Sequence, residues 1–211
     1  MALAVSEVVV ILGQSCHRNL YWVPQFEAEY RSALDRVTFW YPPEWNGEHL
    51  WHPYTPAKDE RYDRTNRATG YDAWLKTTGA ELWSHAADLQ EKGTQFAVVA
   101  FSNGSALGWE IALHFRNCAC VLFTATVPVR SQQLRYAELS MCRTGFLHGT
   151  KDTWYFGGHE HVRRVADEMG SLFWEYDGGH SSDCLADVVK ALGELMRHTE
   201  EPQVKRRCLC A

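Results

Sequence analysis

The chain has 211 residues, a length that suits one domain, and 45% of them are hydrophobic, which is enough to form a sizeable core. Its formal net charge of −5 argues against a general polyanion-binding surface, so we expect no nucleic-acid partner. The amino terminus lacks the basic region of a secretory signal, and no stretch approaches the roughly 18 apolar residues of a membrane span. The seven cysteines are scattered and odd in number, so we expect a cytoplasmic protein with reduced thiols and no structural disulfide.

Short, continuous apolar runs bounded by turn residues predict strands that are buried on both faces. These runs lie at 8–12, 37–41, 96–101, 121–126, 144–149 and 171–176, and helical patterns lie at 25–35, 72–92, 105–116, 157–169 and 183–198. Their alternation predicts an α/β fold, with a mostly parallel sheet of about six strands and helices on both faces. We expect this fold to form a single domain over residues 1–200.

The connection after the second predicted strand, residues 42–71, is too long for a simple loop and is rich in aromatic, proline and charged residues. Long structured connections are often lids or binding loops. A partly disordered insertion is the alternative, but the aromatic content of the segment argues against it. We therefore expect a lid or specificity loop, with Trp45 and Trp51 as candidate substrate-binding residues.

The third predicted strand, residues 96–101, runs directly into Ser102, Asn103 and Gly104, and a helical pattern follows. Ser and Asn often accept hydrogen bonds from the free N–H groups at a helix N-terminus, so Ser102 is open to interpretation as a helix cap. A sharp strand-to-helix turn between small residues also lifts a nucleophilic Ser out of a sheet, as in the G-x-S-x-G pattern. Here Ala100 stands at the first small position.

Two short patterns suggest metal ligands, Cys118-Ala-Cys120 and His159-Glu-His161. Each supplies only two ligands, at a spacing unlike the usual zinc patterns. The two thiols are expected to act as small hydrophobic groups in a strand, and the two histidines to flank the start of a helix. We therefore expect no metal and no organic cofactor.

Polar residues with catalytic potential follow three different predicted strands, at the edge of the sheet where ligands gather in such folds. Ser102 follows the third run, Asp152 the fifth and His180 the sixth. Taken singly, Asp152 is open to interpretation as a turn residue and His180 as part of a glycine-rich loop. The order nucleophile, acid, base across three strands favours a catalytic triad.

These blocks resemble the α/β-hydrolases, and within them the small serine hydrolases of the FSH-type and carboxylesterase/phospholipase groups. The residues that match are FSNGS at 101–105, HGTKD at 148–152 and GGH at 178–180. Two positions depart from the family pattern, because Ala100 replaces a Gly and Leu12 stands where the family has the His of its L-H-G block. The second departure affects the loop that contributes to the oxyanion hole.

The resemblance implies a serine hydrolase that cleaves a small-molecule carboxylic ester or thioester through an acyl-enzyme. Ser102 would be the nucleophile, His180 the general base and then acid, and Asp152 the group that orients the imidazole. The oxyanion hole would use the backbone N–H groups of Asn103 and Gln14.

Two other functions are compatible with parts of the sequence. GQS at 13–15 and DGGH at 177–180 resemble the first and last blocks of SGNH esterases, in which Ser15 would attack with the help of Asp177 and His180. The chain has no G-x-N-D block, and that assignment leaves the FSNGS turn unexplained. A non-catalytic binding protein with the hydrolase fold is the second alternative.

The segment 201–211 is expected to be a flexible tail that ends in Cys208-Leu209-Cys210-Ala211. This ending matches the C-a-a-X pattern for farnesylation, although Cys210 is not the usual aliphatic residue at its position. The basic cluster at 205–207 would supply a second membrane signal. The expectation is a possible lipid attachment at Cys208, with peripheral association at a membrane face.

Overall fold

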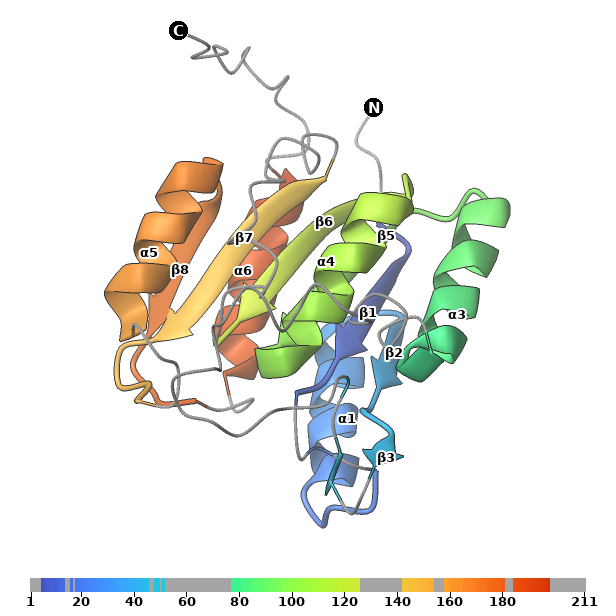
Figure 1. Cartoon of the computed structure of the whole chain (residues 1–211), viewed down its shortest axis with the longest axis horizontal. Coiled ribbons are helices and arrows are strands. Elements are labelled where there is room, and N and C mark those ends of the chain that lie inside the picture. Colours follow the sequence, from blue (N-terminus) through green and yellow to red (C-terminus); the bar gives the residue numbers. More distant parts are fainter. Residues whose placement is uncertain are drawn as a thin grey trace, which may run out of the picture.

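The computed structural model of this chain describes residues 5–13, 16, 18–45, 48–49, 51, 77–125, 142–153, 158–180 and 184–197. Six strands of this part form one sheet in the order β2-β1-β5-β6-β7-β8, and every neighbouring pair in it is parallel (Figure 1). The strands are β1 (Glu7–Ile11), β2 (Val37–Trp40), β5 (Phe96–Phe101), β6 (Cys118–Thr124), β7 (Arg143–Gly149) and β8 (Leu172–Tyr176). The expected α/β fold is confirmed.

Helices cover both faces of the sheet, and Figure 1 looks onto the face that α4 covers. The helices are α1 (Val23–Ala33), α3 (Ala80–Glu91), α4 (Ser105–His114), α5 (Gly158–Met169) and α6 (Leu185–Arg197). One apolar cluster joins the sheet to α3, α4 and α5, and a second joins it to α1 and α6. Along β1, Val9 and Ile11 belong to the first cluster, while Val8 and Val10 belong to the second. Both faces of the strand are therefore apolar, which explains its continuous hydrophobic run.

The structure adds detail to the expected elements at several places. A short antiparallel pair, β3 (Glu44–Trp45) and β4 (Glu48–His49), follows β2 and was not expected from the sequence. Two-residue strands are too short to produce a periodic pattern. Strand β6 begins at Cys118, and both Cys118 and Cys120 are buried in it, as expected of small hydrophobic residues. Helix α3 begins at Ala80, directly after Gly79.

None of the helices in the described ranges combines the length and the apolar composition needed to cross a bilayer. The most apolar of them, α4, is buried from Ser105 to Ala112 because it packs over the middle of the sheet. A helix that is apolar on all sides requires such a position. Helix α4 is therefore a rigid support for the turn that precedes it.

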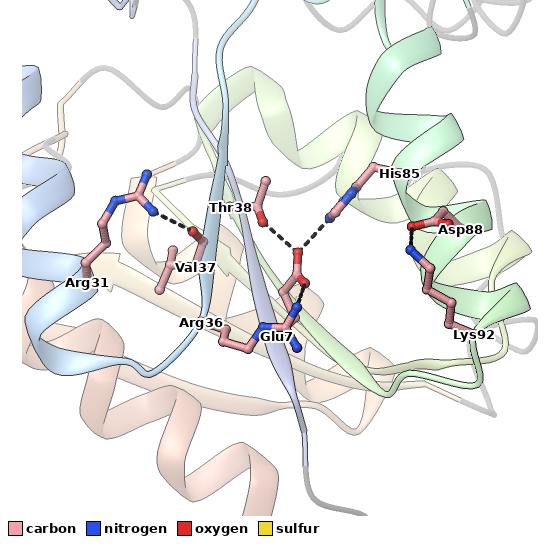
Figure 2. Close-up of polar contacts among 8 residues, drawn as sticks. All are labelled: Glu7, Arg31, Arg36, Val37, Thr38, His85, Asp88 and Lys92. Carbon is pink, nitrogen blue, oxygen red and sulfur yellow. Dashed lines mark hydrogen bonds and ion pairs between the residues drawn. The ribbon is translucent and has the colours of Figure 1, made fainter.

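The amino-terminal end of β1 carries a buried carboxylate that joins β1, β2 and α3. Glu7 is 5% exposed and accepts a hydrogen bond of 2.6 Å from Oγ1 of Thr38 (Figure 2). The Nε2 atom of His85, on α3, lies 2.6 Å from the same carboxylate, and Arg36 lies 3.6 Å from its other oxygen. Because a buried carboxylate requires polar partners, these contacts fix α3 against the edge of the sheet.

The close packing of α4 on β5 accounts for the departure at Ala100. A Cβ atom built on Gly108 would lie 2.7 Å from the Cβ atom of Ala100, which is fully buried. The space for the Ala100 methyl group is therefore provided by a glycine on the facing helix. The strand-to-helix turn tolerates Ala in place of Gly because α4 carries the compensating small residue.

We predict that Gly108→Ala lowers the free energy of unfolding by about 1–3 kcal/mol, because the new methyl group overlaps Ala100. This loss should appear although Ala is the better helix former. Ala100→Gly in the same chain should recover most of the loss, which urea unfolding of the two single variants and the double variant would measure. Additive effects of the two substitutions would contradict this packing.

Candidate active site

The carboxyl ends of three parallel strands bring Ser102, Asp152 and His180 together. Ser102 follows β5, Asp152 follows β7 and His180 follows β8. The Oγ atom of Ser102 lies 2.9 Å from Nε2 of His180, and Nδ1 of His180 lies 2.8 Å from Oδ2 of Asp152. Both distances are those of good hydrogen bonds. The three residues singled out in the sequence therefore form one continuous hydrogen-bonded chain in this structure.

Ser102 occupies a sharp turn between β5 and α4. Its φ is +47°, in the left-handed region that is costly for a residue with a side chain, by about 1–3 kcal/mol. It begins a short 3₁₀ turn, Ser102–Gly104, and α4 starts at the next residue. Neither this turn nor α4 has a side-chain hydrogen bond at its cap. The hydroxyl of Ser102 thus contacts His180 and does not cap the helix.

Backbone hydrogen bonds hold the loops that carry Asp152 and His180 against each other. The N–H of Thr150 donates to the carbonyl of Tyr176 at 3.0 Å, and the N–H of Lys151 donates to the carbonyl of Gly178 at 2.8 Å. The phenol of Tyr176 then donates to the carbonyl of Gly179 at 2.5 Å. These contacts fix the distance between the two loops independently of the side chains that face each other.

Burial differs along the hydrogen-bonded chain. The side chain of Asp152 is fully buried, whereas that of His180 is 23% exposed. A buried carboxylate is stabilised by a partner that donates a hydrogen bond, which His180 supplies through Nδ1 when its other nitrogen accepts from Ser102. The carboxylate of Asp152 therefore lies at the buried end of this series of hydrogen bonds, and the hydroxyl of Ser102 lies at the opposite end.

A second imidazole, that of His148, lies beside the same carboxylate. Its Nε2 atom is 3.7 Å from Oδ2 of Asp152, and its side chain is fully buried at the end of β7. Burial lowers the pKa of His148 below its ordinary value of 6.5; nearby Asp152 opposes this effect, and His159 and His180 add to it. In the sequence, His148 stood out only as part of the HGTKD block, but a His inside a buried strand also indicates a polar partner elsewhere in the fold.

The first of the two expected oxyanion-hole residues, Asn103, follows Ser102 in the 3₁₀ turn. Its side-chain amide nitrogen and oxygen are both buried and have no hydrogen-bond partner in the part of the chain that the structure describes. The second, Gln14, lies outside the described residues, as does Ser15. The preceding residue, Gly13, lies next to Ser102, because a Cβ atom built on it would be 2.8 Å from the Cβ atom of Ser102.

The two tryptophans expected to bind substrate are placed differently from each other. Trp45 lies in β3, but its side chain is outside the described part. Trp51 is only 2% exposed, belongs to the core on the α3 and α4 face, and donates its indole N–H to the carbonyl of Leu12 at 2.6 Å. This placement favours a structural role for Trp51 over the substrate contact that the sequence suggested. Residues 52–71 and the tail with Cys208 lie outside the described ranges.

The alternative assignment with Asp177 as the acid finds no support in the geometry. The side chain of Asp177 is 79% exposed, and its carboxylate pairs with Nζ of Lys151 at 2.6 Å. Nδ1 of His180 contacts Asp152 instead. Within the described ranges, no three side chains of the His, Cys, Asp and Glu types gather in a way that would hold a metal ion.

We predict a specific pH dependence of stability from His148. Because its pKa is lowered in the folded state, the unfolded chain binds more protons, and the free energy of unfolding should fall as the pH drops below about 6.5. His148→Gln should lack this component, since Gln does not titrate. Denaturant unfolding of both proteins between about pH 7.5 and about pH 5 measures the difference. Parallel pH profiles for the two proteins would contradict the assignment.

No family model and no curated protein sequence matches the chain. Solved structures do match. Esterase PE8 is 19% identical, with 91% of this chain and 93% of that chain covered and a TM-score of 0.62. Arabidopsis thaliana SOBER1 is 18% identical over 94% and 100% of the two chains, with a TM-score of 0.61. Zea mays acyl-protein thioesterase 2 is 16% identical over 90% and 93%, with a TM-score of 0.58.

At these identities the likeness concerns the fold, and it extends over nearly the whole of each chain. The six-stranded parallel sheet, the helices on both faces and the turn at Ser102 are the features described above. The chain therefore has the α/β-hydrolase fold.

Proposed function

We propose that the chain is a serine hydrolase that cleaves a carboxylic ester or thioester through an acyl-enzyme intermediate. The observation that carries this proposal is the hydrogen-bonded chain from Ser102 through His180 to Asp152, with distances of 2.9 Å and 2.8 Å. A serine hydroxyl becomes a useful nucleophile only when an adjacent imidazole accepts its proton, and that imidazole needs a carboxylate to hold its tautomer. Ser102, His180 and Asp152 supply the hydroxyl, the imidazole and the carboxylate.

In the first half of the proposed reaction, Oγ of Ser102 attacks the carbonyl carbon of the substrate while its proton passes to Nε2 of His180. Asp152 stabilises the imidazolium that forms. The backbone N–H groups of Asn103 and Gln14 donate hydrogen bonds to the substrate oxygen and stabilise its negative charge. The bond to the alcohol or thiol then breaks, and His180 returns the proton to the leaving group.

In the second half, a water molecule attacks the acyl group on Ser102, and His180 again accepts a proton. Collapse of the second tetrahedral intermediate breaks the bond to Oγ, and the proton on His180 returns to Ser102. The products are a carboxylic acid and an alcohol or thiol. The reaction consumes only the substrate and water.

The compared structures support the choice of bond. They include an esterase and an acyl-protein thioesterase, so their shared fold is associated with cleavage of both oxygen and sulfur esters. The exposed position of the His180 side chain relative to Asp152 also agrees with a base that must meet substrate and water.

We predict that Ser102→Ala lowers kcat for p-nitrophenyl acetate by about a million-fold, because it removes the nucleophile and little buried volume. Ser15→Ala is the matched control, since it tests the alternative nucleophile with the same atomic change, and it should keep the activity of the wild type. Circular dichroism would verify that both variants fold. Wild-type turnover by Ser102→Ala, or loss of activity only in Ser15→Ala, would reject the proposal.

We also propose that the 42–71 segment sets the preference for acyl-chain length. Strand β2 runs parallel to β1, so the β3–β4 pair that follows it starts from the same edge of the sheet as Ser102. Trp45 lies in this pair, and in this proposal its indole adds apolar area to a site otherwise built from small loops. Each CH₂ group that it covers would contribute about 0.8 kcal/mol to binding.

We predict that Trp45→Ala lowers kcat/KM more for the octanoate ester of p-nitrophenol than for the acetate ester. Tyr21→Ala removes an aromatic ring that is 94% exposed and serves as the control. Tyr21→Ala should change kcat/KM equally for the two esters, or leave both values unchanged. An equal loss on both esters in Trp45→Ala would show that this tryptophan has no part in chain-length selection.

A further inference from the structure

Trp51 makes one polar contact that connects the segment after β2 to the loop beside the nucleophile. Its indole N–H donates to the carbonyl of Leu12 at 2.6 Å, across 39 positions of the sequence. Leu12 is the first residue after β1, and its own N–H donates to the carbonyl of Trp40 on β2 at 2.9 Å. Both backbone groups of Leu12 are therefore held by residues from elsewhere in the fold.

The peptide group that follows Leu12 lies directly against the turn that carries Ser102. A Cβ atom on Gly13 would be 2.8 Å from the Cβ atom of Ser102 and 3.1 Å from the carbonyl of Phe101. The carbonyl oxygen of Leu12 itself lies 2.8 Å from where a Cβ atom on Gly104 would stand. Contacts this close leave no room for a side chain on Gly13 or on Gly104. The position of the Leu12–Gly13 peptide therefore determines the free space beside Ser102.

The loop after β1 needs a hydrogen bond from another segment to fix its position, because the side chain of Leu12 cannot donate one. Leu12 is fully buried in the core on the α1 and α6 face, so it contributes only apolar contact. Trp51 is anchored in turn on the opposite face, where its ring is buried in the core beside α3 and α4. Its carbonyl accepts a hydrogen bond of 2.6 Å from Oγ1 of Thr78.

From these contacts we propose that Trp51 is a positioning residue for the hydrolytic site. Its indole N–H fixes the carbonyl of Leu12, so that the Leu12–Gly13 peptide is held against the turn that carries Ser102. This inference rests on the proposed function, which assigns the second oxyanion donor to the backbone N–H of Gln14, the residue that follows Gly13 in the sequence. Trp51 touches neither substrate nor reacting atoms in this role.

The expected effect is on the transition state and not on substrate binding. Displacement of a catalytic group by about 1 Å costs on the order of 100-fold in rate, and loss of one oxyanion donor costs about 100- to 1,000-fold in kcat. A ground-state ester carbonyl depends much less on this donor. Loss of the Trp51 hydrogen bond should therefore lower kcat with little change in KM.

The test compares Trp51→Phe with Trp174→Phe. Both replacements remove an indole N–H and keep an aromatic ring. Trp174 donates to Oε2 of Glu194 at 2.7 Å, between β8 and α6, and three strands of the sheet separate β8 from β1. Each protein would be assayed with p-nitrophenyl acetate, with phenylboronic acid as a mimic of the tetrahedral intermediate, and by thermal unfolding.

Trp51→Phe should lower kcat by about 10- to 100-fold with KM within about threefold of the wild type, and boronate affinity should fall along with kcat. Trp174→Phe should lower the melting temperature without these changes. Wild-type kcat and boronate affinity in a folded Trp51→Phe would overturn the inference while leaving the proposed function intact. An inactive wild type would instead reject the proposed function, and the inference with it.

If Trp51→Phe does not fold, Thr78→Val replaces it, because this change removes only the hydroxyl that holds the carbonyl of Trp51. A fall in kcat of about threefold or more at unchanged KM would support the inference. Unchanged kcat in Thr78→Val would overturn it.

Discussion

The alignment of the carboxyl ends of β5, β7 and β8 is the constraint on which the proposed site depends. Ser102 and His180 are 78 positions apart in the sequence, and Asp152 and His180 are 28 positions apart, so no local element brings them together. The pairing of Gly149 with Tyr176 at the end of β7 and β8 places the acid and base loops side by side. Strand β6 sets the separation between this pair and Ser102. A one-residue shift of register would break the hydrogen-bonded chain.

Several costly features of the fold lie at this edge of the sheet. Ser102 has a left-handed backbone, the side chain of Asp152 is buried, and His148 is buried beside it. Strained or buried polar residues persist only where the surrounding structure holds them. Helix α4 and the two apolar clusters supply that support, and the Glu7 contacts at the other end of β1 join α3 to the same sheet (Figure 2). Stability and proposed chemistry therefore depend on the same packing.

Much of the fold was predictable from sequence because its strands are buried on both faces and appear as continuous apolar runs. The grouping of Ser102, Asp152 and His180 was predictable for a related reason, since residues that follow parallel strands meet at one edge. The catalytic roles of these residues stay predictions. In contrast, the contact between Trp51 and Leu12 joins two segments that no periodic pattern connects. The expectation that Trp51 contacts substrate therefore depended only on the aromatic composition of the 42–71 segment.

Other features were hidden for similar reasons. The accommodation of Ala100 depends on Gly108, which lies on a different element, and a glycine inside a helical pattern gives no sign of what it faces. The burial of His148 follows from its place near the end of an interior strand of the sheet, and its lowered pKa follows from that burial. Each of these properties belongs to a pair of elements and not to a segment, so it becomes visible only when the elements are packed together.

The most direct test of the central claim is covalent labelling of the wild-type chain with a fluorophosphonate, which reacts with an activated serine. Peptide mass spectrometry would then locate the phosphonyl group. We predict one label per chain, on the peptide that contains Ser102, and no label after His180→Ala removes the base. No labelling of the folded wild-type protein, or a label on the peptide that contains Ser15, would contradict the assignment of Ser102 as the nucleophile.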